Sequence, residues 1–324
     1  MGISADVRKR GFMAINKVMH AALKAISYVD LDIHKTYKLS RNFQTMISKL
    51  YTPPKDYEIW DHRVLNGGYQ VPVRIFTGKN AEPSKTLLFF HGGGWITGDI
   101  NTYNRICVDM CAETGCRVIS VDYRLAPERR FPTAIEDCYA VLRELMREKS
   151  RGAFHGEIIL IGDSAGGNIA AAVSLMARDR GEFLPTKQIL IYPATSNDHS
   201  EDALFPSITQ NGTDYLLTAK RVSDYLELYR SCDEDLNNPY FAPLLEKDLR
   251  NQPDTLVITA DLCPLRDEGE YYGQLLRSAG NRVTIHRVID ALHGFFTLPP
   301  FFKHVAEAYE VMNAFLGQEG SIEK

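Results

Sequence analysis

The sequence predicts an α/β protein with a mostly parallel eight-stranded sheet, helices on both faces of that sheet, and a helical cap. Three observations lead to this class. Short, continuously apolar strands alternate with helical stretches, as is typical of a parallel sheet that is covered on both faces. The stretch Glu157–Asn168 runs an apolar strand through a glycine-flanked serine into an alanine-rich helix. Finally, 324 residues with 44% hydrophobic content can bury a large core.

The chain begins with a helical segment and a hairpin. Apolar residues within 12–26 recur at spacings of three and four, which predicts an amphipathic helix. Pro53-Pro54 interrupts that pattern. Residues 57–64 and 69–76 then alternate in polarity around Asn66-Gly-Gly68, a strong hairpin signal. We therefore expect the sheet to open with two antiparallel strands.

Six further strands follow, and one connection between them is unusually long. Between 192 and 254 the pattern changes to polar loop and helix, too long for an ordinary connection in such a fold. We predict that this insertion meets the N-terminal helix to form the cap. The six strands are expected at 86–90, 117–121, 158–161, 188–192, 255–259 and 283–287. The corresponding domain boundaries are an N-terminal cap segment at 1–52, a main domain at 53–193, a cap insertion at 194–252 and the rest of the main domain at 253–324.

Composition excludes several classes of partner. The net charge of −4, from 37 basic and 41 acidic residues, gives no patch for nucleic acid or an anionic membrane. No apolar run is long enough to span a bilayer and no signal peptide is apparent, so we expect a cytoplasmic protein without a stable membrane anchor. Cys107, Cys111 and Cys116 lack a C-x-x-C pair and are expected to be buried thiols, with no metal or other cofactor. A homodimer is compatible with these features.

The Gly162-x-Ser164-x-Gly166 pattern predicts a nucleophile elbow, a sharp strand-to-helix turn that exposes the serine at the top of the sheet. A serine hydroxyl is a poor nucleophile until an adjacent base takes its proton. The sequence should therefore supply a carboxylate and then a histidine after Ser164, in that order.

Three histidines follow the serine where loop geometry is relevant. His286 falls within a strand and His199 within the insertion, whereas His293 comes just after the last strand and Gly294 lets the chain turn there. We therefore predict that His293 is the base.

Two aspartates compete for the role of the acid, Asp261 and Asp267, both after the strand that ends at Thr259. Spacing does not choose between them. Asp267 also has a structural interpretation, because together with Glu270 it resembles a capping box at the start of a helix.

A glycine-rich loop, His91-Gly-Gly-Gly-Trp95, follows the strand that ends at Phe90. Such a loop can present backbone N–H groups to the negative oxygen of a tetrahedral intermediate, and the N–H of Ala165 would add another donor. Nucleotide binding is disfavoured, because no Gly-Lys-Ser/Thr is present and Thr97 stands where G-x-G-x-x-G needs glycine.

Five motifs together resemble the hormone-sensitive lipase group of α/β-hydrolases, bacterial carboxylesterases in particular, over roughly residues 55 to 316. The resemblance implies an α/β-hydrolase fold with a helical cap. It also implies that the catalytic acid is Asp267 and that the oxyanion donors are Gly92, Gly93 and Ala165. The motifs are His91-Gly-Gly-Gly-Trp95, Asp122-Tyr-Arg-Leu-Ala-Pro-Glu128, Gly162-Asp-Ser-Ala-Gly166, Leu265-Arg-Asp-Glu-Gly269 and His293-Gly-Phe295.

The sequence thus predicts a serine carboxylesterase that needs no cofactor and acts on small-molecule esters of short to medium acyl length, acetyl esters included. Ser164 would attack the ester, His293 would carry the proton and Asp267 would orient the imidazole. An amidase or lactonase with the same triad is an alternative. So is a non-catalytic small-ligand receptor on the same fold, although such receptors resembling this family lack the histidine that is present here.

Overall fold

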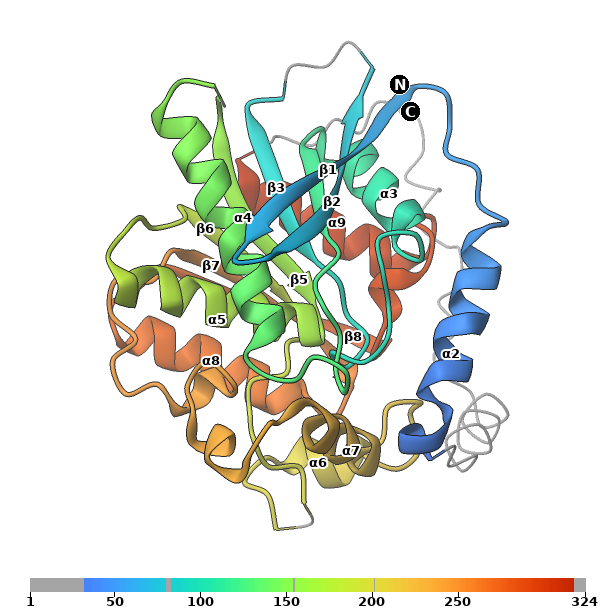
Figure 1. Ribbon diagram of the computed structural model, residues 1–324. Helices are drawn as coiled ribbons and strands as arrows, with labels where there is room; N and C mark the ends of the chain where they lie inside the picture. The colour runs from blue at the N-terminus through green and yellow to red at the C-terminus, as the bar shows by residue number, and fades with distance from the viewer. Residues whose placement is uncertain (1–31, 80–82, 154, 201, 318–324) are drawn as a thin grey trace, which may run out of the picture.

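The computed structural model describes residues 32–79, 83–153, 155–200 and 202–317 (Figure 1). The helix predicted at 12–26 lies outside these residues. One eight-stranded sheet forms the centre, with the strand order β1-β2-β4-β3-β5-β6-β7-β8. The pairs β1–β2 and β2–β4 are antiparallel, and every other neighbouring pair is parallel. The predicted mostly parallel sheet is confirmed.

Each predicted strand is present within a few residues of its expected position. The hairpin also closes where expected, because Asn66 pairs with Tyr69 around two glycines. The strands are β1 (Tyr57–Asn66), β2 (Tyr69–Gly78), β3 (Lys85–Phe90), β4 (Arg117–Val121), β5 (Glu157–Asp163), β6 (Lys187–Ile191), β7 (Asp254–Leu262) and β8 (Val283–Leu292).

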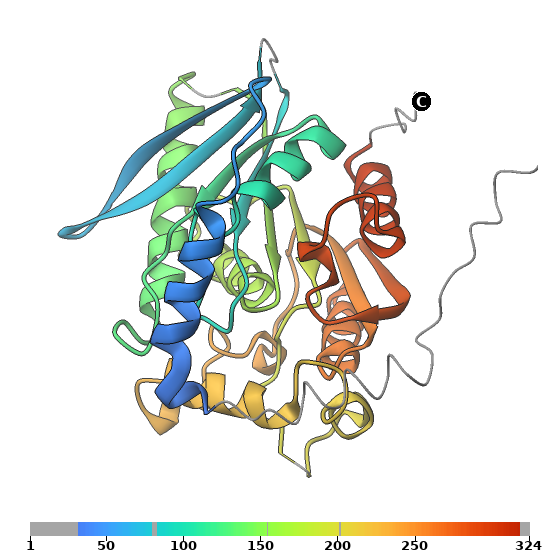
Figure 2. The same cartoon turned by 90° about the vertical axis from the view of Figure 1, so that its right-hand side faces the viewer.

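Helices cover both faces of the sheet (Figures 1 and 2). One face packs against α4, α5 and α8, and the other packs against α3 and α9. The α-helices are α2 (Ile33–Ser48), α3 (Asn104–Thr114), α4 (Thr133–Ser150), α5 (Ala165–Arg180), α6 (Pro206–Asn211), α7 (Ala219–Tyr229), α8 (Arg266–Ser278) and α9 (Lys303–Leu316). Short 3₁₀ helices are η1 (Asp233–Asn237), η2 (Pro243–Leu245) and η3 (Phe295–Thr297).

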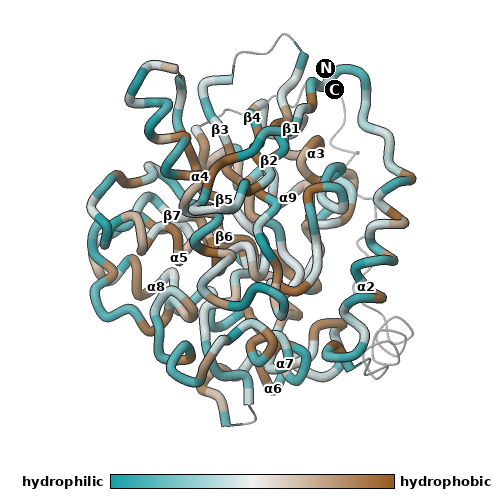
Figure 3. Tube along the Cα trace, in the orientation of Figure 1, coloured by the Kyte–Doolittle hydropathy of each residue, from teal (hydrophilic) through white to brown (hydrophobic). Residues whose placement is uncertain are grey.

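The central strands explain why the apolar runs in the sequence are continuous. Ile158–Ile161 of β5 and Ile189–Ile191 of β6 are buried, because helices lie on both sides of them. Hydropathy along the chain shows the same concentration of hydrophobic residues in the middle of the sheet (Figure 3). The sheet is therefore a rigid platform from whose carboxyl edge the loops project.

The elements expected to form the cap are α2, α6 and α7. α6 and α7 lie beyond the carboxyl ends of the strands, whereas α2 runs along the side of the molecule towards α7 (Figure 1). α2 and α7 are in contact although they are far apart in the sequence. α6 and α7 belong to the segment between β6 and β7 that the sequence marks as an insertion. None of the helices described here combines the length and the hydrophobicity that a membrane span requires.

Candidate active site

Ser164 occupies the turn between β5 and α5, with a φ of 55° and a ψ of −118°. A positive φ is uncommon for a residue with a side chain and marks backbone strain at a tight turn. The turn is crowded, since a Cβ at Gly166 would lie 1.9 Å from the carbonyl oxygen of Phe90. Ser164 therefore has the strained conformation that a nucleophile elbow requires.

His293 lies directly beside this serine. Its Nε2 is 3.0 Å from Ser164 Oγ, which is hydrogen-bond distance. The histidine follows β8, and Gly294, with a φ of 84°, turns the chain into η3. The ring also packs against Tyr192, with the two centroids 4.7 Å apart. The structure thus brings together the predicted nucleophile and the predicted base.

The other ring nitrogen of His293 faces a sulfur atom. Nδ1 is 3.1 Å from the Sγ of Cys263, a buried residue in the loop between β7 and α8. The backbone N–H of Leu265 also donates to this sulfur, at 3.3 Å. Burial raises the pKa of the Cys263 thiol well above its usual range, so the group is neutral at physiological pH. The position that a carboxylate occupies in a Ser-His-Asp triad is held here by a thiol.

Asp267, the predicted acid, is engaged elsewhere. Its Oδ1 accepts a hydrogen bond from Arg266 Nε at 2.7 Å, and its Oδ2 accepts one from the backbone N–H of Ser207 at 2.8 Å. Burial opposes the ionisation of Asp267, but Arg266 and Ser207 outweigh it, so the pKa of Asp267 is below its ordinary value. Asp267 makes no hydrogen bond to His293: it lies in the first turn of α8, whereas Cys263 in the preceding loop contacts the imidazole.

Asp261, the competing aspartate, is also occupied by cations. Its Oδ1 lies 3.7 Å from a guanidinium nitrogen of both Arg266 and Arg287. Neither aspartate that the sequence offers therefore contacts the imidazole in this structure.

The glycine-rich loop contributes donors, although not the pair that the resemblance implied. The N–H of Gly92 donates to Asp163 Oδ1 at 2.8 Å, so this group is not available to a substrate. Asp163 is buried, which raises its pKa to about 7, and its other oxygen accepts a hydrogen bond from the Tyr103 hydroxyl at 3.2 Å. Gly92 therefore anchors the loop and does not serve as an oxyanion donor.

The available N–H groups belong to the next residues of the loop and to the start of α5. Gly93, Gly94 and Ala165 line the cavity at Ser164. Among the described residues, their N–H groups have no acceptor within the protein. Ala165 is the first residue of α5, where an N–H has no partner inside the helix and the helix dipole favours negative charge. These three groups are the candidates for the oxyanion hole.

A cavity of about 250 Å³ opens beside the nucleophile. Its wall includes Leu217, Val222 and Tyr225 from the segment between β6 and β7, and Gln44 from α2. The Tyr225 ring packs so closely on Gly94 that a Cβ there would lie 2.6 Å from the ring. α7 and the loop before it thus supply an apolar wall, and Tyr225 also restricts the position of the oxyanion loop.

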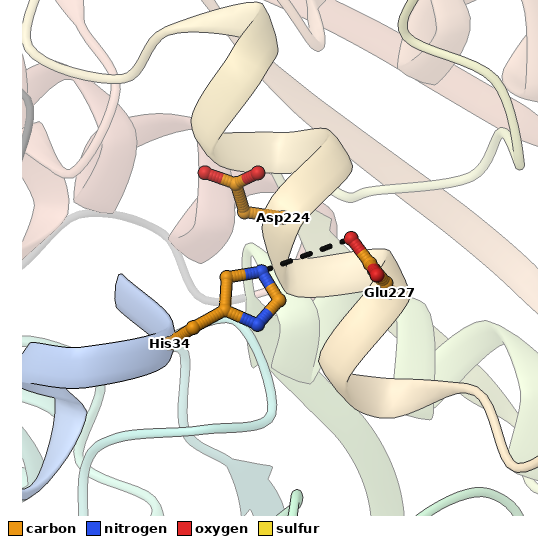
Figure 4. A group of neighbouring side chains, drawn as sticks. All are labelled: His34, Asp224 and Glu227. Atoms are coloured by element: carbon orange, nitrogen blue, oxygen red, sulfur yellow. Dashed lines mark ion pairs between the residues drawn. The ribbon is translucent and has the colours of Figure 1, made fainter. Parts of the chain in front are cut away.

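The rim of the cap carries a small polar cluster (Figure 4). His34 of α2 lies 3.7 Å from Glu227 of α7, and Asp224 completes a group of donor atoms within 4.8 Å of one another. Among the described residues, these three side chains form the group of possible ligands that lie close enough together to hold a metal ion. His34 and Glu227 are exposed, and we interpret the group as a contact between the two helices.

Sequence reasoning missed Cys263, Gly94 and Tyr225. Cys263 lies between Asp261 and the Leu265–Gly269 motif, but a thiol there carries no pattern that distinguishes it from a small buried residue. Gly94 is in the quoted loop, and only the hydrogen bond between Gly92 and Asp163 shows which of its glycines are free. Tyr225 lies on α7, where nothing in the local pattern marks it as a pocket residue.

A profile of the alpha/beta hydrolase fold matches residues 87–297, which include the elbow, the oxyanion loop and the histidine. The chain belongs to the α/β-hydrolase family. The resemblance to the hormone-sensitive lipase group and the fold expected from it are thereby confirmed.

Several relatives of this chain are ester hydrolases by name. The carboxylic ester hydrolase LipN of Mycobacterium tuberculosis is 34% identical over 253 residues, which span 76% of this chain and 66% of LipN. An arylesterase of Saccharolobus solfataricus is 33% identical over 273 residues, covering 84% of this chain and 88% of its own. The solved structure of a hyperthermophilic esterase from Pyrobaculum calidifontis superposes with a TM-score of 0.83 at 31% identity, over 93% of this chain and 97% of that one.

Proposed function

We propose that this α/β-hydrolase is a serine carboxylesterase that acts on small-molecule esters of short to medium acyl length. One observation carries the proposal: Ser164 Oγ, on a strained elbow, lies 3.0 Å from His293 Nε2 and beside three unpaired N–H groups. The named relatives are ester hydrolases, which supports the same reaction class. We retain the cap boundaries at 1–52 and 194–252 as part of the proposal.

The reaction begins with proton transfer. His293 Nε2 takes the Ser164 proton as Oγ attacks the ester carbonyl carbon, which forms a tetrahedral intermediate and an imidazolium. The N–H groups of Gly93, Gly94 and Ala165 are placed to stabilise the negative oxygen. Such preorganised donors act most strongly where water is excluded.

Collapse of the intermediate breaks the bond to the leaving group. His293 Nε2–H gives its proton to the departing alkoxide, and the acyl group remains on Ser164. A water molecule then loses a proton to His293 and attacks the acyl carbon. The second tetrahedral intermediate collapses, the carboxylic acid leaves, and Ser164 regains its proton.

The cavity supports the preference for modest acyl groups. It is small, at about 250 Å³, and Tyr225 and Val222 form part of its wall. An apolar wall of this kind binds the hydrocarbon portion of a substrate, and its dimensions limit the length that fits. A long acyl chain would have to displace cap residues.

A non-catalytic receptor for a small ligand is the second candidate, and one observation favours it. No carboxylate contacts His293 in the described residues, and the imidazole instead faces the neutral Cys263. A site that only binds its ligand has no need to stabilise an imidazolium.

A panel of p-nitrophenyl esters from acetyl to palmitoyl tests the proposal. We expect hydrolysis that is fastest for the shorter members and that falls by about three to six orders of magnitude in Ser164→Ala. Ser174→Ala, a change at another buried serine of α5, is the matched control and should retain activity. Saturable binding without hydrolysis of any ester would favour the receptor.

A further inference from the structure

The contact between Cys263 and His293 suggests a role for a residue that the reaction steps above do not use. Cys263 Sγ is 3.1 Å from His293 Nδ1, and the cysteine is completely buried. We propose that Cys263 is the positioning residue of this esterase site, and that its sulfur accepts a hydrogen bond from His293 Nδ1–H in the place of a catalytic carboxylate. This inference rests on the proposed serine esterase function.

The direction of the hydrogen bond is part of the proposal, and two contacts support it. The N–H of Leu265 can only donate, and it points at Sγ from 3.3 Å, so the sulfur already acts as an acceptor. If Sγ also accepts from His293, the imidazole proton is on Nδ1. The lone pair of Nε2 then faces Ser164 Oγ, which is the tautomer that a general base needs.

The fixed position of Cys263 makes this orientation stable. The residue lies between β7 and α8, two elements that pack on each other, and its side chain has no access to solvent. A sulfur held on a rigid loop can fix the plane of the imidazole as a carboxylate would.

The difference from a carboxylate is the charge. Burial keeps the thiol protonated and neutral, and burial alone lowers the pKa of His293 to about 3. Tyr192 packs on the same ring, and burial raises the pKa of its hydroxyl well above the ordinary value, so it is neutral too. Within the described residues, therefore, no anion contacts the imidazolium that forms during the reaction.

More distant charges do not replace the missing carboxylate. Glu268, the acid whose charge acts on the Cys263 thiol, is buried, and its Oε2 lies 2.6 Å from His199 Nε2. It also accepts the N–H groups of Thr195 and Ser196. Arg266 brings a positive charge to the same loop and opposes the effect of Glu268 on the thiol. The site thus keeps the geometry of a triad without its full electrostatic stabilisation.

Three substitutions at Cys263 separate geometry from charge. Cys263→Ala removes the acceptor and should lower kcat by about ten- to a hundredfold with little change in KM. Cys263→Ser retains an acceptor and should keep kcat within about threefold of the unsubstituted protein. Cys263→Asp adds the charge and should raise kcat by about ten- to a thousandfold. Cys138→Ala, at a buried thiol of α4, is the matched control.

Two readouts respond to positioning and not to packing alone. In Cys263→Asp the acid limb of kcat/KM should move to higher pH, because a carboxylate favours the imidazolium. In the nitrogen-15 NMR spectrum of the unsubstituted protein, His293 should be the Nδ1–H tautomer, and Cys263→Ala should lose that preference. If Cys263→Asp does not fold, the Cys263→Ala and Cys263→Ser variants, together with the NMR measurement, still test whether Cys263 positions His293.

The inference is overturned if Cys263→Ala keeps the kcat, pH profile and tautomer of the unsubstituted protein. This failure is distinct from failure of the proposed function, which is judged by ester hydrolysis and by the Ser164→Ala variant. If the unsubstituted protein hydrolyses no ester, a gain of hydrolysis in Cys263→Asp supports the positioning role. The absence of such a gain, together with the wrong tautomer, refutes it.

Discussion

Arg41 of α2 forms a two-point ion pair with Glu128, with Nη1–Oε1 and Nη2–Oε2 both at 3.0 Å. The same guanidinium donates to the carbonyl oxygens of Ile96 and Ala126, at 2.6 and 2.7 Å. One side chain therefore ties the cap helix to the oxyanion loop and to the Asp122–Glu128 motif. These contacts brace the loops beside the site.

Arg41→Ala should loosen α2 from the body of the protein. We expect it to lower the free energy of unfolding by about 1–3 kcal/mol and to raise KM for small esters, because Gln44 of the same helix lines the cavity. Arg250→Ala is the matched control, since Arg250 makes a two-point pair with Asp248 that is local and exposed. Urea unfolding and ester kinetics on both variants measure the effects, and equal, small changes in the two would contradict the anchoring role.

Gly94→Ala should damage catalysis more than stability. The new Cβ would lie 2.6 Å from the Tyr225 ring, and relief of that clash must move either the ring or the N–H groups of the oxyanion loop. We expect kcat to fall by about a hundredfold or more. Gly115 is the matched control, because it has the same φ of 62° with open space around it. Gly115→Ala should therefore lower the stability only by the backbone strain of a positive φ, about 1–2 kcal/mol. Turnover that is equal in the two variants would show that Gly94 has no role at the site.

Asp267 is expected to act on structure and not on turnover. Asp267→Asn keeps an acceptor for the Ser207 N–H and should change kcat by less than about tenfold, whereas Asp267→Ala should cost about 1 kcal/mol of stability. The kcat and thermal midpoint of both variants test this. A loss of two or more orders of magnitude in Asp267→Asn would restore Asp267 as the catalytic acid.

The pH profile should reflect the buried imidazole. The base works in its neutral form, and burial lowers the pKa of His293 to about 3. We therefore expect kcat/KM for a neutral ester to stay level as pH falls through about 6.5, the ordinary imidazole value, and to decline only below about pH 5. An acid limb with its midpoint between about 6 and 7 would contradict the shift.

Stability should change with pH over the same range, so it must be measured beside the rate. The unfolded chain binds a proton at His293 below about pH 6.5 and the folded protein does not, so His293 destabilises the fold as pH falls towards about 3. Asp163 acts in the opposite direction. Its pKa is raised to about 7 in the folded protein. Its contribution to the free energy of unfolding is therefore fully present below about pH 4 and is lost as pH rises through 7. Thermal midpoints at each pH separate unfolding from protonation of the base.

The sheet was predictable because its signals are local. Buried parallel strands must be apolar on both faces, so stretches such as Ile158–Ile161 are recognisable from the sequence alone. The hairpin was equally readable, because Gly67 and Gly68 suit its tight turn. The elbow was found because the turn at Ser164 admits almost no side chain at Gly166.

The remainder of the site depends on contacts between distant segments. Which of three residues reaches His293 depends on where β7 ends and α8 begins, because Asp261 lies in β7, Cys263 in the loop and Asp267 in the first turn of α8. The resemblance implied an aspartate, and the structure instead places the Cys263 thiol at Nδ1. Likewise, the sequence of the glycine loop cannot reveal that Asp163 occupies the Gly92 N–H.

The central claim is that Ser164 is a nucleophile activated by His293, and trapping the serine tests it most directly. The protein is incubated with a fluorophosphonate, and the adduct is counted by intact mass and located by peptide mapping. We predict one adduct per chain, on Ser164, with labelling abolished in Ser164→Ala and strongly slowed in His293→Ala, because the hydroxyl needs its base. Labelling at another residue, or an unlabelled Ser164 in a protein that hydrolyses esters, would contradict the account.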